Sequence, residues 1–174
     1  MESVTTRKVT ISDLEQLQVV SKQTFYETFS PVNTEENMRK YIEEDLSEGR
    51  LRNEINNPGS EFYFAIHIDE IIGYLKLNTG DAQTEIKDLN AFEIERIYVL
   101  KEYLGKKVGQ ILFEKAVQVA KQKNADYIWL GVWENNPRAI RFYRKNGFVE
   151  FDQHIFKLGN DEQTDIMMKL KFNK

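Results

Sequence analysis

The chain has 174 residues, no cysteine, and a formal net charge of −4 from 24 basic and 28 acidic side chains. This length predicts a single domain over residues 1–174 with one core, and the missing cysteines exclude disulfides and cysteine-ligated metal sites. With 41% hydrophobic and 12% aromatic residues, the chain has enough core-forming side chains to fold despite its 30% charged residues.

The same composition limits location and partners. The longest apolar runs, such as residues 128–133, are far shorter than the roughly 18–20 residues that cross a bilayer. The first ten residues lack the apolar stretch of a secretory signal, which together with the missing cysteines predicts a cytoplasmic protein with no membrane partner. A mildly acidic chain without a basic stripe argues against nucleic acid as a partner.

The first third of the chain is predicted to be helical. Ser12 and Glu15 have the spacing of a capping box, and apolar side chains follow helical spacing until Pro31, which predicts a helix over residues 12–30. A threonine three residues after this proline can cap a second helix. A third short helix is expected before the Pro-Gly turn at residues 57–59.

Strands follow. Residues 62–68 and 71–78 are rich in β-branched and aromatic side chains and flank Asp69 and Glu70, which predicts a hairpin. After a polar link, residues 92–100 alternate as a third strand. Strict alternation places one set of side chains on one face of this strand: Glu93, Glu95, Ile97 and Val99. It places the others on the opposite face: Ile94, Arg96 and Tyr98.

The second half predicts a parallel crossover. Helical spacing begins at Lys107, and a nearly continuous apolar run over residues 126–133 reads as a buried parallel strand. Residues 136–137 then open a helix with proline in its first turn, Gly147 closes it, and two final strands flank the turn at residues 159–160. The expected fold class is a mixed α/β sheet with an early hairpin.

One candidate site is the loop over residues 103–109, which joins a strand to a helix. Backbone N–H groups at a helix N-terminus and the helix dipole favour an anion, and Lys106 and Lys107 add positive charge. The alternative is a solvated turn without a ligand.

A second candidate site lies in residues 132–148, where a buried strand runs into a short helix. Its pattern is Asn136-x-x-Ala139, then Phe142-Tyr143, then Gly147-Phe148. This pattern resembles the acetyl-CoA-binding half of the GNAT acyltransferases, whose pyrophosphate loop matches residues 103–109 in place and order. The chain is similar, more narrowly, to bacterial polyamine N-acetyltransferases of the PaiA type at three segments: residues 93–98, 128–134 and 161–165.

The loop departs from the family pattern. The family's Gln or Arg, Gly, and Gly or Ala positions fall on Leu104, Lys107 and Gly109, and only the last position matches. The Lys107 Cβ would crowd the approach of the backbone to a pyrophosphate, or its ammonium would partly neutralise that group while Gly105 absorbs an unusual backbone angle.

The resemblance implies the GNAT fold, with acetyl-CoA as cosubstrate and no metal. Two parallel strands would splay apart around Val99 and Val132, and the pantetheine arm would lie between them. A backbone N–H near Ile97 would face the thioester carbonyl and stabilise an oxyanion. The implied cofactor-binding residues are Ile97, Tyr98, Val99, Leu104, Gly105, Lys106, Lys107, Val108, Gly109, Asn136 and Tyr143.

The implied reaction is acetyl transfer to a primary amine, with a polyamine such as spermidine or spermine as the small-molecule partner and direct attack in a ternary complex. An alkylamine with a pKa of about 10.4 is almost fully protonated at pH 7, so a base must remove a proton before attack. Glu93 and Glu95 are the candidate bases, and we expect Glu95 to lie nearer the carbonyl. Tyr143 occupies the family's position for the acid that protonates the departing thiolate.

Each of these residues has a structural alternative. Glu93 and Glu95 could be the solvated side of a strand, and Tyr143 a half-buried aromatic whose hydroxyl bonds the backbone. Asn136 could cap the helix that begins after it, which does not exclude contact with a cofactor. His67 and His154 look isolated and receive no role.

The aromatic residues divide into two groups. Trp129 and Trp133 are expected in the core, because a nearly continuous apolar strand of a parallel sheet is buried on both faces. Phe25, Tyr26 and Phe29 are expected to pack the first helix, and the resemblance implies that some of them contact the acceptor.

Alternatives remain for the acceptor and for the function. The acidic span over residues 35–48 is either a solvated helix face or an attractor of polycations. The acceptor could instead be a protein amino group or an amine-bearing drug, or the protein could sense acetyl-CoA without catalysis. The outer sheet edges would also allow a homodimer.

Overall fold

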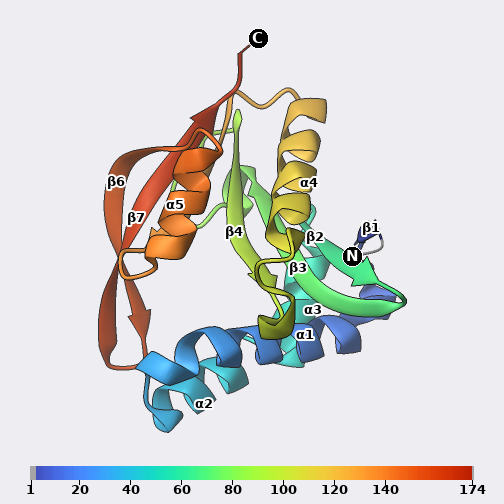
Figure 1. Cartoon of the computed structure of the whole chain (residues 1–174), viewed down its shortest axis with the longest axis vertical. Helices are drawn as coiled ribbons and strands as arrows, with labels where there is room; N and C mark the ends of the chain where they lie inside the picture. Colours follow the sequence, from blue (N-terminus) through green and yellow to red (C-terminus); the bar gives the residue numbers. More distant parts are fainter. Residues whose placement is uncertain (1–2, 174) are drawn as a thin grey trace.

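The computed structural model describes residues 3–173, and over this range seven strands form one mixed sheet in the order β1-β2-β3-β4-β5-β7-β6 (Figure 1). The strands are β1 (Thr5–Lys8), β2 (Ser60–His67), β3 (Glu70–Thr79), β4 (Ala91–Val99), β5 (Tyr127–Trp133), β6 (Val149–Leu158) and β7 (Asp161–Lys171). The α-helices are α1 (Leu14–Phe29), α2 (Glu35–Glu44), α3 (Glu48–Asn56), α4 (Val108–Gln122) and α5 (Pro137–Lys145). The predicted mixed α/β sheet with an early hairpin is confirmed.

The start of α1 differs from the prediction. The helix begins at Leu14 after a 3₁₀ turn over Ile11–Asp13, and the reciprocal cap is formed by Thr10 and Asp13 rather than by Ser12 and Glu15. The Thr10 N–H donates to Asp13 Oδ2 at 2.8 Å, and Arg7 donates to the same carboxylate at 2.9 and 3.1 Å. This guanidinium fixes the carboxylate at the turn, an arrangement that spacing alone does not reveal.

Two features of the sheet edge were also missed. Strand β1 is polar throughout and was not predicted, because an edge strand held by backbone bonds to β2 needs no apolar pattern. The β2–β3 turn consists of Ile68 and Asp69, with φ of 45° and 62°, one residue earlier than predicted. A left-handed turn residue with a β-branched side chain is rare, so the sequence pointed to the following polar pair instead.

A β-bulge in β4 overturns the predicted alternation. Lys76 pairs with Arg96 and Leu77 with Ile94, so Glu95 is an extra residue on β4. The extra residue reverses the parity of the strand. Ile94, Ile97 and Val99 all belong to the core cluster beneath α4, so the prediction that Glu93 and Glu95 share a face with Ile97 and Val99 is wrong.

Strands β4 and β5 splay apart, as the resemblance implied. Their parallel pairing covers only Ala91–Ile94 against Tyr127–Leu130, although β5 stays paired with β7 as far as Trp133. Residues 95–99 of β4 and 131–133 of β5 therefore leave backbone groups facing one another without a ladder. In Figure 1, α4 and α5 flank this gap, with α4 beside β4 and α5 beside β7, and α1 and α2 cross its open end.

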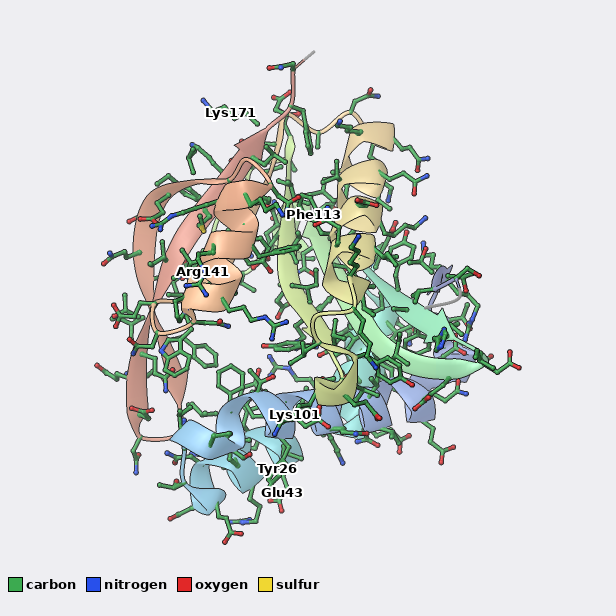
Figure 2. All side chains as sticks on the ribbon, viewed as in Figure 1. Tyr26, Glu43, Lys101, Phe113, Arg141 and Lys171 are labelled. Atoms are coloured by element: carbon green, nitrogen blue, oxygen red, sulfur yellow. The ribbon has the colours of Figure 1, made fainter. Side chains whose placement is uncertain are left out.

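Two main cores hold the sheet between these helices. The first packs α4 and α5 against the sheet, and Phe113 of α4, labelled in Figure 2, contacts the rings of Phe142 and Phe148 there. The second packs α1, α2 and α3 on the opposite face, around residues such as Phe25 and Tyr74. The sheet thus has a packed core on each face.

Candidate active site

Two cavities meet at β4. The larger, about 1010 Å³, lies between the loop before α4, the splayed part of β4 and α5. The smaller, about 290 Å³, lies on the other face of β4, between α1 and the β6–β7 hairpin. Tyr98 lines both cavities, so their contents would approach each other at the splayed end of β4.

The larger cavity gathers the predicted cofactor-binding residues. All of them line it except Lys106, whose ammonium lies 5.0 Å from the centroid of the Tyr103 ring. Arg138 and Lys145 of α5 also line it and were not predicted. Lys101, labelled in Figure 2, joins its rim to α1, because its backbone N–H donates to Glu27 at 2.7 Å.

The loop before α4 leads into a first helical turn that presents backbone donors to this cavity. Lys107 is the N-cap residue of α4 and is left-handed, with φ 65° and ψ 11°, while Gly105 has φ 79°. The first N–H bonded within the helix is that of Ile111, to the Lys107 carbonyl at 3.1 Å. The N–H groups of the preceding turn are therefore available to an anion. A left-handed lysine costs roughly 1–2 kcal/mol, which explains why glycine suits this position better.

Asn136 and Tyr143 bring α5 to the same cavity. Asn136 Oδ1 accepts from the Ala139 N–H at 3.1 Å, so this residue caps the helix and lines the cavity at once. Tyr143 is 6% exposed, packs on Phe148, and has no acceptor for its hydroxyl among the described residues. Burial raises the pKa of Tyr143 well above its usual range, so the phenol stays protonated at physiological pH.

The smaller cavity combines carboxylates with aromatic rings. Its charged lining consists of Glu85, Glu93, Glu95, Arg96, His154 and Asp165. Its aromatic lining consists of Phe25, Phe29, Tyr41, Tyr74, Tyr98, Trp133 and Phe156. An ammonium group is attracted both by carboxylates and by ring faces, so this lining suits a cationic amine.

The structure separates the aromatic residues that were predicted together. Phe25 and Phe29 line the smaller cavity, whereas Tyr26 is 52% exposed on the outer side of α1 (Figure 2). Trp129 is fully buried, as predicted, and donates to Gln83 Oε1 at 2.8 Å. Trp133 is only partly buried and lines the cavity, so its prediction as a core residue is wrong.

Glu95 is held by cations. It forms ion pairs with Lys76 and, at 3.7 Å, with Arg96, and it accepts from Asn78 Nδ2 at 2.8 Å. Burial acts to raise the pKa of Glu95, but the charges of Arg96 and Lys76 outweigh it and hold that pKa below its usual value. Glu54 of α3 contacts both cations, at 2.8 Å from Arg96 and 3.3 Å from Lys76.

Glu93 has only neutral partners. It is 3% exposed and accepts from the backbone N–H of Thr84 at 2.8 Å, from the Thr84 hydroxyl, and from Asn78 Nδ2 at 3.1 Å. Burial raises the pKa of Glu93 despite these hydrogen bonds. A buried carboxylate without a cation is the better proton acceptor of the two.

His154 is not isolated, contrary to the expectation from sequence. It lies in the smaller cavity, 3.4 Å from a carboxylate oxygen of Asp165 and 3.4 Å from one of Glu85. These three residues and Thr84 were missed, because they come from a polar link and from the final hairpin and share no motif. His67 lies apart, with its ring 6.2 Å from that of Tyr103.

Two further features concern the described residues as a whole. Over residues 3–173 there is no group of three or more His, Asp or Glu side chains that could hold a metal ion. Within the same range, each helix is too short or too polar to cross a membrane.

Glu43 of α2, labelled in Figure 2, pairs with Arg39 at 2.9 Å on the exposed face of that helix.

Comparisons with known proteins agree with this geometry. Residues 22–148 match the model of the acetyltransferase (GNAT) family. An uncharacterized N-acetyltransferase of Lactobacillus delbrueckii subsp. lactis is 41% identical over 169 residues, 97% of this chain and 98% of the relative. The spermidine N(1)-acetyltransferase of Thermoplasma acidophilum is 29% identical over an alignment that covers 98% of this chain and 98% of that relative.

A solved structure supports the same assignment. The PaiA N-acetyltransferase of Thermoplasma acidophilum, crystallised in complex with coenzyme A, superposes with a TM-score of 0.79 at 30% identity, over 98% of this chain and 99% of that one. The chain therefore belongs to the GNAT acetyltransferase family and is PaiA-like in sequence and fold.

Proposed function

We propose that this protein transfers the acetyl group of acetyl-CoA to a primary amine of a small polycation such as spermidine or spermine. The observation that carries the proposal is the smaller cavity, where carboxylates and aromatic rings adjoin the larger cavity through Tyr98. The similarity to a spermidine N(1)-acetyltransferase supports the choice of acceptor.

The residues of the larger cavity fit acetyl-CoA. Unpaired backbone in the gap between β4 and β5 suits an extended pantetheine arm, and the N–H groups in the first turn of α4, with Lys107 and Arg138, suit the pyrophosphate. Bound acetyl-CoA would supply the acetyl group as a thioester. The chain has no cysteine to form an acyl-enzyme, which favours direct attack by the amine.

Within this proposal Glu93 is the base. It lies in the amine cavity with a raised pKa and no cationic partner, so it can take a proton from the bound ammonium directly or through water. Glu95, tied to Lys76 and Arg96, shapes the bulge instead. Tyr143, on the cofactor side, donates a hydrogen bond or a proton to the sulfur that departs.

A panel of amines tests the proposal. Release of CoA would be measured with spermidine, spermine, a simple monoamine, a lysine peptide and an amine-bearing antibiotic. We expect turnover to be fastest with the polyamines, because their flexible chains can place several ammonium groups among the carboxylates. Turnover with the peptide or antibiotic alone would reject the polyamine acceptor, and cofactor binding without turnover of any amine would favour a sensor.

Variants of Lys107 distinguish the two effects expected of its side chain, crowding of the pyrophosphate by its Cβ and neutralisation of the pyrophosphate by its ammonium. Because its backbone is already left-handed and it lines the cavity, we expect its ammonium to contribute to CoA binding. Lys107→Ala and Lys107→Gly should both raise the Kd for CoA by about three- to tenfold in calorimetry, as expected for a partly exposed charge at a helix terminus. Lys106→Ala is the matched control and should bind as the wild type. Tighter binding by the glycine variant would show that the Cβ crowds the pyrophosphate.

A further inference from the structure

His154 is surrounded by carboxylates from three separate parts of the chain. It pairs with Asp165 across the β6–β7 register, and its Nε2 lies 3.4 Å from Asp165 Oδ2. Its Nδ1 lies 3.4 Å from Glu85 Oε1, in the link before β4. Glu93 of β4 adds to the negative potential at the ring.

The Nδ1 atom of His154 lacks a hydrogen bond although it is buried, as judged among the described residues. In the neutral ring with its N–H toward Asp165, Nδ1 is an acceptor, and so is the Glu85 carboxylate. These two acceptors, which lie 3.4 Å apart, can be satisfied by one shared donor group, such as an ammonium nitrogen about 2.8 Å from each of them. In the imidazolium, the ring's own N–H faces Glu85 instead.

Gly131 keeps space for this arrangement. A Cβ at this position of β5 would lie 3.0 Å from His154 Cε1 and 3.3 Å from Asp165 Oδ2. The imidazole and the carboxylate therefore lie directly against the backbone of β5, within the splayed part of that strand. All three residues line the smaller cavity.

We propose, on the basis of the proposed function, that His154 is a specificity-determining residue: as neutral imidazole it binds, with Glu85 and Asp165, the second ammonium group of a diamine or polyamine. As imidazolium it excludes that group, since a proton on the ring and the cationic ligand compete for the same carboxylates. Acceptors with two cationic nitrogens are then preferred over monoamines, and more strongly as the pH rises.

The charges around His154 set the pH range over which its proton and the cationic ligand compete. The contact with Asp165 raises the pKa of His154, burial opposes the rise, and Glu85 and Glu93 add to it. Alkylamines, with pKa values of about 10.4, keep their charge across the range in which an imidazole titrates. A change in diamine binding over this range therefore reports on the protein and not on the ligand.

An NMR titration tests the proposal without any turnover. The chain has two histidines, so the His67→Gln variant leaves His154 as the only imidazole signal. We expect saturating 1,4-diaminobutane to lower the apparent pKa of His154 by about 1, which corresponds to about tenfold coupling between ligand and proton. Butylamine should lower it much less. A pKa that stays constant or rises with the diamine would overturn the proposal.

Kinetics provide a second, independent readout. His154→Gln should raise KM for the diamine about tenfold more than KM for the monoamine at pH 8.5, and it should abolish the fall of the diamine KM between pH 6 and 8.5. His67→Gln should leave KM unchanged for both amines. An equal loss for both amines in His154→Gln would indicate a merely structural residue. If no amine is turned over, the proposed acetyl transfer fails, yet the NMR result still decides the role of His154.

Discussion

Tyr143→Phe is expected to lower kcat by about 10²–10⁴-fold while leaving the Kd for CoA and the stability of the fold nearly unchanged. The hydroxyl has no protein acceptor among the described residues, so its removal breaks no internal hydrogen bond. A thiolate with a pKa near that of cysteine, about 8.5, departs poorly from a buried site unless a donor faces it. The raised pKa keeps this donor protonated, so the phenol should introduce no loss of rate below about pH 9.

The control for this variant is Tyr63→Phe. Tyr63 belongs to the same core cluster but lines neither cavity, and its hydroxyl donates to Glu61 at 2.6 Å. We expect Tyr63→Phe to lose about 1 kcal/mol of stability and to retain kcat. Steady-state rates of CoA release with the best amine would compare the two. Equal kcat in Tyr143→Phe and wild type would remove the phenol from the reaction and favour a purely structural ring.

Glu93→Gln is expected to have the second large effect, a decrease in kcat/KM of about 10²–10⁴-fold near pH 7. The amide keeps the size of the side chain but cannot accept the proton of an ammonium. At higher pH more of the amine is already neutral, so the loss of kcat/KM in the variant should become smaller as the pH approaches the pKa of the amine, about 10.

The wild-type profile follows from the same carboxyl group. Because the pKa of Glu93 is raised, the base becomes protonated as the pH falls through a value above that of an ordinary glutamate. Activity should therefore decline on the acid side earlier than for an unperturbed carboxylate, and this limb should vanish in Glu93→Gln. A measured pH–rate profile with the limb intact in the variant would assign the base elsewhere.

Glu95→Gln offers a contrast within the same strand. Here the main loss should be stability, about 1–3 kcal/mol in chemical denaturation, because buried Lys76 loses one of its two carboxylate partners. The chemical step should suffer less than in Glu93→Gln. A larger loss of kcat in Glu95→Gln, with stability unchanged, would restore Glu95 as the base.

The sequence was sufficient for the fold class and for most residues that line the larger cavity. Helix and strand periods are local, and the predicted cofactor-binding residues lie in a few short segments, so both could be recognised without knowing which strands pair. The left-handed backbone of Lys107 was the exception, since the strain at a family glycine is visible only in the structure. Lys106 was included for its positive charge, and in the structure its ammonium lies 5.0 Å from the centroid of the Tyr103 ring.

The smaller cavity could not be predicted in the same way. One extra residue at Glu95 reverses the alternation of β4, and no periodicity reports an insertion of one residue. Thr84 and Glu85 lie in a polar link, while His154 and Asp165 come from the last hairpin. They meet only because β7 lies between β5 and β6, a long-range pairing that spacing does not encode.

A crystal structure with CoA bound would test the central claim most directly. We predict that the pantetheine arm lies between residues 95–99 of β4 and 131–133 of β5, with the sulfur toward Tyr143, the pyrophosphate at the N-terminus of α4, and the open end facing Glu93. CoA bound elsewhere, with β4 and β5 paired along their full length, would contradict it.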